Sequence, residues 1–280
     1  MHISFTLRDV FTTPDFMNFI NSHMYLLIKP NLCSTHLPAV TPLKTVQEII
    51  LHLNHQVPHA EYSVMLIESD QTIYSLETKL AETGYDKLPT KVINAKDFWR
   101  NLSLQEAFRT NKLGFINLPI IKASDMPNIH MSCAVKNLFG LIASPKKASL
   151  HKHLPQVLRS LHSKLKDYVY TIVDGSRCME GNGSPIHGDI VVFPQFYIHG
   201  LNLMEIDNYV CNTIMGFPLP SYLDSVTISN EPPFSHPKFG HFRPSVMKPI
   251  RKLVLQSFND DSDGKIISFL RGVKERWLKQ

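Results

Sequence analysis

Three lysines stand in apolar stretches of this 280-residue sequence: Lys29, Lys122 and Lys136. An ammonium group is costly to bury unless a carboxylate or an anionic ligand accompanies it. A desolvated lysine can bind a carboxylate or phosphate, accept a proton, or form a Schiff base. We favour anion binding, and keep snorkelling of the side chain or a structural ion pair as alternatives.

Four carboxylates form the acidic counterpart of these lysines: Glu68, Asp174, Glu180 and Asp207. They can neutralise the lysines, transfer protons, or hold a hard divalent cation such as Mg²⁺ or Mn²⁺ through oxygen ligands. The sequence does not choose among these roles, so a bound metal stays an open alternative. The candidate catalytic residues on these grounds are Lys29, Lys122, Glu68, Asp174 and Glu180.

Polar groups next to these residues are candidates for holding a substrate. The stretch "MEGNG", residues 179–183, indicates a backbone turn that brings Glu180 and main-chain N–H groups near the ligand. A short Gly-x-Gly is weak evidence for phosphate, and neither a Walker sequence nor G-x-G-x-x-G is present. The candidate substrate-binding residues are Asn31, Ser69, Lys136, Asn137, Gly181 and Gly183.

The regular elements predict how these residues come together. Residues 24–29 read as a buried strand, 43–56 as an amphipathic helix and 62–67 as a second strand. This β-α-β unit indicates parallel strands, whose carboxyl ends share one edge of a sheet. We therefore expect an α/β fold, a mostly parallel sheet flanked by helices and built from β-α-β units, in which Lys29, Glu68, Lys122 and Asp174 converge.

Further elements follow the same pattern along the chain. The patterns predict helices at 76–84, 129–142, 153–166, 203–215 and 265–278, and strands at 90–94, 168–173 and 189–193, with a glycine-rich loop after Asp174. No repeat or low-complexity segment divides the chain. We expect a single domain over 1–280, with a basic helix in a C-terminal extension over 218–280.

Composition excludes several classes of protein. The four cysteines, at 33, 133, 178 and 211, form no C-x-x-C pair, so no zinc site and no intrinsic iron–sulfur cluster is expected. The run 259–264 resembles the start of an EF-hand loop but has Leu270 in place of the final glutamate, so a calcium site is not expected there.

The sequence contains neither a transmembrane run nor a secretory signal, so a cytoplasmic protein without a membrane partner is expected. The net charge of +5 is mild, and no nucleic-acid motif is present.

Several segments in order, "LLIKPNL", "MLIESD", "INLPIIK", "AVKNLFGLI", "TIVDGSRCMEGNG" and "EIDNYVCNTIMGF", resemble the bacterial and archaeal family called domain of unknown function 362. The resemblance covers residues 24–217. Members of this family often also have a histidine at the position of His151, which adds His151 as a candidate for catalytic proton transfer. The chain departs from the family at Ser124, where members often read K-T-H, and it lacks the ferredoxin-like module that many members carry.

These observations predict an enzyme of a biosynthetic pathway that acts on a small carboxylate- or phosphate-bearing metabolite by acid/base or lysine-assisted chemistry. The reaction class is not specified. Two alternatives stay open: a redox accessory partner of a separate iron–sulfur protein, which the family's ferredoxin module suggests, and a non-catalytic ligand-binding protein. A homo-oligomer is also left open.

Overall fold

The computed structural model describes residues 1–56, 64–71, 74–126, 128–142, 149–181, 188–223 and 231–245. Its strands are β1 (His2–Ser4), β2 (Tyr25–Pro30), β3 (Val64–Glu68), β4 (Lys91–Asn94), β5 (Leu113–Leu118), β6 (Ile120–Ala123), β7 (Met131–Ser132), β8 (Val169–Glu180), β9 (Asp189–Val192) and β10 (Tyr197–Gly200). Its α-helices are α1 (Leu7–Phe11), α2 (Pro14–Ser22), α3 (Leu43–Gln56), α4 (Leu76–Thr83), α5 (Ala95–Phe98), α6 (Leu102–Arg109), α7 (Ala134–Asn137), α8 (Leu154–Leu165) and α9 (Leu203–Tyr209).

The described strands form one mixed, mostly parallel sheet, which confirms the predicted α/β class. The main order is β1-β10-β8-β5-β2-β3-β4, and the five strands from β8 to β4 are parallel to one another. From β2 the chain proceeds outward through β3 to β4, then returns to place β5 on the other side of β2. The order of the strands therefore reverses between β2 and β5, which makes this position a topological switch point.

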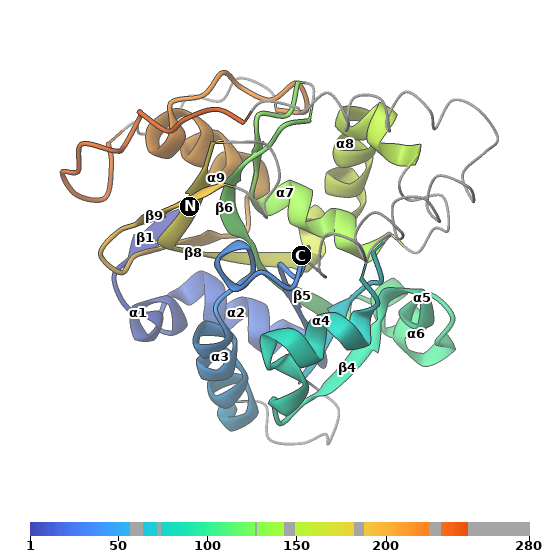
Figure 1. Ribbon diagram of the computed structural model, residues 1–280. Helices are drawn as coiled ribbons and strands as arrows, with labels where there is room; N and C mark the ends of the chain where they lie inside the picture. The colour runs from blue at the N-terminus through green and yellow to red at the C-terminus, as the bar shows by residue number, and fades with distance from the viewer. Residues whose placement is uncertain are drawn as a thin grey trace.

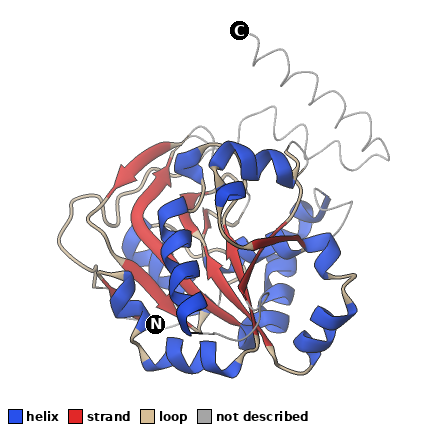
Figure 2. Cartoon of the chain, turned by 90° about the horizontal axis from the view of Figure 1, so that it is seen from below, coloured by secondary structure: helices blue, strands red, loops and turns tan. Residues whose placement is uncertain are grey.

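Helices cover both faces of the sheet (Figures 1 and 2). Leu26 and Ile28 of β2 pack with α1, α2 and α3 in one apolar core, whereas Leu27 packs with α5 to α9 in the other. This alternation follows from the two-residue period of a strand. Lys29 therefore belongs to the face of Leu27, the side on which α7 and α8 lie.

The helices begin and end where local chemistry directs them. In α4, the Ser75 side chain accepts a hydrogen bond from the N–H of Thr78, and Gly84 ends the helix with φ of 78°.

The predicted helix over 43–56 matches α3, and its predicted apolar face is buried. The strands predicted at 24–29 and 62–67 match β2 and β3 within two residues.

Three predicted elements differ from the structure. The helix predicted over 129–142 is instead β7, the one-turn helix α7 and a 3₁₀ turn over Leu138–Leu141. The loop predicted after Asp174 begins later, because β8 continues to Glu180 and pairs with both β6 and β9. The helix predicted over 203–215 is divided into α9 and a π-helical turn over Val210–Met215.

The C-terminal helix predicted at 265–278 and the run 259–264 lie outside the described residues. Within the described part of the chain, no helix combines the length and the apolar character that crossing a bilayer requires.

The edge of the sheet formed by β1, β10 and β8 holds a buried histidine. His199 lies between two hydroxyl groups, with Ser4 Oγ 2.9 Å from its Nε2 and Tyr170 Oη 2.8 Å from its Nδ1. Burial, with a smaller contribution from the neighbouring His2, lowers the pKa of His199 to about 4. The folded protein therefore holds this ring neutral, and protonation of His199 favours unfolding.

We expect the His199 contribution to stability to be present above pH ~6.5 and lost as the pH falls toward ~4, by at most about 3 kcal/mol. The unfolded chain binds a proton in this window that the folded protein does not. Urea unfolding across this window, for the wild type and for His199→Gln, measures the contribution. Burial raises the pKa of Asp207 to about 6, so Asp207 titrates in the opposite direction in both proteins, and their difference isolates His199. An equally steep acid loss in both would contradict this assignment.

Candidate functional site

The candidate site lies at the carboxyl ends of β2, β3 and β5, around the switch point. Crevices at such points are where open α/β sheets bind ligands. β2 ends in Lys29 and Pro30, and β3 ends in Glu68. Asn117 lies near the end of β5, in register with Lys29 on β2. The chain thus delivers charged and amide side chains to one edge of the sheet from strands far apart in sequence.

An internal ion pair joins β2 to β3. Lys29 Nζ lies 2.8 Å from Glu68 Oε2, and their side chains are 1% and 5% exposed. Glu68 also accepts hydrogen bonds from the main-chain N–H groups of Leu32 and Ser69, at 3.2 and 2.9 Å. A buried pair is stable only when its remaining donors and acceptors are satisfied in this way. The two loops that follow β2 and β3 are therefore fixed on one carboxylate.

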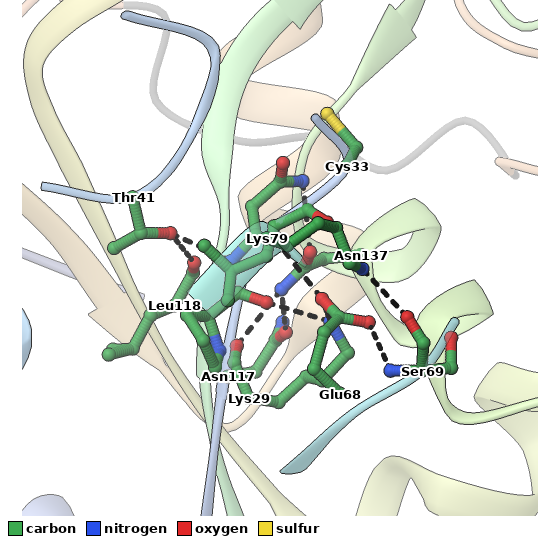
Figure 3. A network of polar contacts seen from close by, with 12 residues as sticks. Lys29, Cys33, Thr41, Glu68, Ser69, Lys79, Asn117, Leu118 and Asn137 are labelled. Atoms are coloured by element: carbon green, nitrogen blue, oxygen red, sulfur yellow. Dashed lines mark hydrogen bonds and ion pairs between the residues drawn. The ribbon is translucent and has the colours of Figure 1, made fainter. Parts of the chain in front are cut away.

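A chain of hydrogen bonds runs from Lys122 across the site (Figure 3 shows part of it). Lys122 Nζ donates to Asn31 Oδ1 at 2.8 Å, and Asn31 Nδ2 donates to Asn137 Oδ1 at 2.9 Å. Asn137 Nδ2 donates to Asn117 Oδ1 at 2.8 Å, and Asn117 Nδ2 donates to Thr171 Oγ1 at 3.1 Å. In every link the donor lies on the Lys122 side and the acceptor on the Thr171 side. The hydrogen bonds therefore fix which way each asparagine amide is turned.

Lys122 makes two further contacts in the loop after β2. Its Nζ lies 2.8 Å from Cys33 Sγ and 3.1 Å from the carbonyl oxygen of Ala39. Lys122 is 3% exposed, whereas Cys33 is half-buried. Cys33 is thus the more exposed member of this contact.

Lys79 belongs to the site although we did not predict it from the sequence. It is fully buried on α4, where its Nζ donates to the carbonyl oxygens of Leu32 at 2.8 Å and Ser69 at 2.7 Å. Burial lowers the pKa of Lys79, and the nearby carboxylate of Glu68 opposes that shift. The signal was available, because Lys79 shares the buried helical face of Leu76 and Thr83 at i+3 and i+4 spacing.

The short helix α7 is held in place by a buried carboxyl. Asp207 accepts hydrogen bonds from the N–H groups of Ala134 and Val135 at 2.6 and 3.0 Å, and from Tyr222 Oη at 2.9 Å. Burial raises the pKa of Asp207 to about 6, although these donors act in the opposite direction. Asp207 therefore positions α7, which carries Asn137.

Two predicted acidic residues lie in separate networks. Asp174 accepts from Thr45 Oγ1 at 2.7 Å, and from Ser176 and Gln195. Glu180 forms ion pairs with Lys238 at 2.7 Å and Arg243 at 3.1 Å. Neither carboxylate makes a direct contact with Lys29 or Lys122 within the described residues.

The remaining predicted residues lie around the site. Lys136 Nζ donates to Ser124 Oγ at 3.0 Å, and the ring of His151 packs edge-on against Phe139. Ser69 contributes its main chain to Glu68 and Lys79. The N–H of Gly181 donates to the carbonyl oxygen of Arg243 at 2.9 Å, whereas Gly183 lies outside the described residues. Among the described residues, no three His, Cys, Asp or Glu side chains are grouped as a metal site would require.

Comparison with protein families gives a match over two thirds of the chain. A family model described as Domain of unknown function (DUF362) covers residues 26–212, which include every site residue from Lys29 to Asp207. Neither the curated proteins nor the solved structures include a match to this chain.

Gly140 lies directly against the ion pair. A β-carbon at this position would lie 2.4 Å from Lys29 Cε, 2.6 Å from Lys29 Nζ and 2.8 Å from Glu68 Oε1. We therefore expect Gly140→Ala to lower the free energy of unfolding by ~1–3 kcal/mol through overpacking. Urea unfolding measures this cost.

The matched background is the double variant Lys29→Ala, Glu68→Gln, which removes the two closest atoms without leaving an unpaired carboxylate. Gly140→Ala should cost less there than in the wild type. An equal cost in both backgrounds would show that the ion pair is not what excludes a β-carbon.

Proposed function

The chain belongs to the family described as Domain of unknown function (DUF362), and we propose that its strand-end site binds a small anionic metabolite and acts on it as an enzyme. The ligand carries a carboxylate or a phosphate group. Lys122 and Lys79 supply the positive charge, Asn31 orients the ligand through its fixed amide, and Lys136 adds a further charge at the margin.

An excess of buried positive charge carries this proposal. Lys29, Lys79 and Lys122 are 1%, 0% and 3% exposed, and one buried carboxylate, Glu68, contacts this group of lysines within the described residues. Lys29 takes Glu68 as its partner. Lys79 and Lys122 contact carbonyl, amide and sulfur atoms, which carry no full negative charge unless the thiol is ionised. Because unpaired ammonium groups are costly to bury, a bound anion would stabilise this arrangement.

The position of the lysines supports the same conclusion. They surround the switch point between β2 and β5, where the crevice outside the strand ends accommodates ligands in α/β sheets. The half-buried Cys33 and Lys136 give this region its contact with solvent. Desolvated lysine is also a group that donates protons, accepts protons or forms covalent adducts with carbonyl substrates. The site is therefore suited to chemistry on the anion that it binds.

We expect calorimetry against inorganic phosphate, phosphomonoesters and small dicarboxylates to find binding that Lys122→Met weakens by roughly tenfold or more, as the loss of a hydrogen bond to a charged group implies. Lys44→Met is the matched control, since Lys44 is 86% exposed on α3. The Lys122 variant should lose less stability than the ~3–5 kcal/mol that follows the loss of one member of a buried ion pair, because the charge removed has no carboxylate in direct contact.

Binding confined to neutral or cationic compounds, or equal affinities for the Lys122 and Lys44 variants, would refute the proposal. Repeating the titrations with Mg²⁺ and Mn²⁺ tests whether a metal takes part. Incubating each bound compound with the protein and following it by NMR separates an enzyme from a protein that binds without turnover.

A further inference from the structure

Cys33 differs from the other cysteines in its surroundings. Cys133, Cys178 and Cys211 are buried, and burial raises the pKa of each thiol. Cys33 is half-buried, and its sulfur lies 2.8 Å from the side-chain nitrogen of Lys122. A thiol that reagents in solution can reach is thus placed directly against a buried lysine.

The two groups are held together by a shared acceptor. Both Lys122 Nζ and Cys33 Sγ hydrogen-bond the carbonyl oxygen of Ala39, at 3.1 and 3.6 Å. Asn31 fixes the same Lys122 nitrogen from another side at 2.8 Å. The nitrogen and sulfur atoms are therefore kept in contact by the fold, although 89 positions separate them in the sequence.

We propose that Cys33 and Lys122 are the site of an oxidative modification, a covalent bridge in which one oxygen atom joins Lys122 Nζ to Cys33 Sγ. The oxidant is dioxygen. Lys122, after giving its ammonium proton to solvent, loses one N–H bond, and Cys33 loses its S–H bond. The O–O bond breaks, one oxygen atom forms the new N–O and O–S bonds, and the other leaves as water. Nitrogen and sulfur each give up two electrons, and dioxygen accepts all four.

The 2.8 Å separation is suited to this product, because a single oxygen atom can bridge nitrogen and sulfur with little movement of either residue. Cys33 is half-buried, and it is the member of the pair from which dioxygen would approach. A thiol reductant that returns four electrons restores the amine, the thiol and a second molecule of water. The modification is therefore reversible, as regulatory cysteine oxidation commonly is.

The bridge would also regulate the anion site, and this consequence alone rests on the proposed function. Bridging removes the ammonium charge of Lys122 and ties β6 to the loop after β2. The oxidised protein then has less excess positive charge in the buried cluster. We expect it to lose anion binding and to regain that binding after reduction.

Intact-mass spectrometry of the full-length protein, kept in air or under anaerobic conditions, tests the modification without reference to any ligand. We expect the aerobic protein to gain the mass of one oxygen atom less two hydrogen atoms, and to lose that gain after treatment with dithiothreitol. Proteolysis should yield one cross-linked pair of peptides, one containing Cys33 and the other Lys122.

Two variants serve as controls. Cys33→Ser removes the sulfur, and Lys122→Arg keeps a positive charge but offers no primary amine, so neither should show the gain. Addition of whole oxygen atoms without loss of hydrogen indicates ordinary sulfur acids, and loss of two hydrogens alone indicates a disulfide or a sulfur–nitrogen bond. Either result, or an unchanged mass in air, overturns the proposal. A bridge that forms while no anion binds at all would reject the proposed function and leave the modification standing.

Discussion

The ion pair between Lys29 and Glu68 is the constraint on which the rest of the site depends. Two charges removed from water require all their remaining hydrogen-bonding positions to be filled. The fold meets that requirement with the N–H groups of Leu32 and Ser69, and with the carbonyl oxygen of Pro30, which accepts from Lys29 at 2.7 Å. The pair thereby sets the paths of both loops at the carboxyl ends of β2 and β3. It also requires a residue without a side chain at position 140, in the 3₁₀ turn that follows α7.

Hydrophobic periodicity correctly predicted those helices and strands that keep one pattern of burial along their whole length. β2, α3 and β3 each have one consistent pattern of burial, so the β-α-β unit could be derived from the sequence. The elements after residue 129 could not be derived in this way, because their apolar residues are buried from several directions. The N–H groups at the start of α7 also donate to Asp207, which is more than seventy positions away in the sequence. Tertiary contacts also extend β8 through Gly175, where no local pattern indicates a strand.

The site was predicted in part. Lys29, Glu68, Asn31 and Lys122 come together because strand ends meet at one edge of a parallel sheet. Asp174 was expected at a strand end, but β8 continues past it to Glu180, and its carboxylate accepts a hydrogen bond from Thr45 of α3 instead of joining this group. Glu180 forms ion pairs with Lys238 and Arg243, which lie in a segment without helix or strand whose position no local pattern indicates. Lys79 was missed because a lysine on an amphipathic helix is ordinarily taken as exposed.

The uniform direction of the amide chain gives the site an electrical polarity. Each amide between Lys122 and Thr171 carries a dipole, and hydrogen bonds in series polarise one another. The positive charge of Lys122 therefore orients a series of dipoles, whose positive ends point from the loop after β2 through α7 and β5 toward β8. A change in that charge, by ligand or by chemistry, becomes a change of field felt at the centre of the sheet, well beyond the reach of the lysine side chain itself.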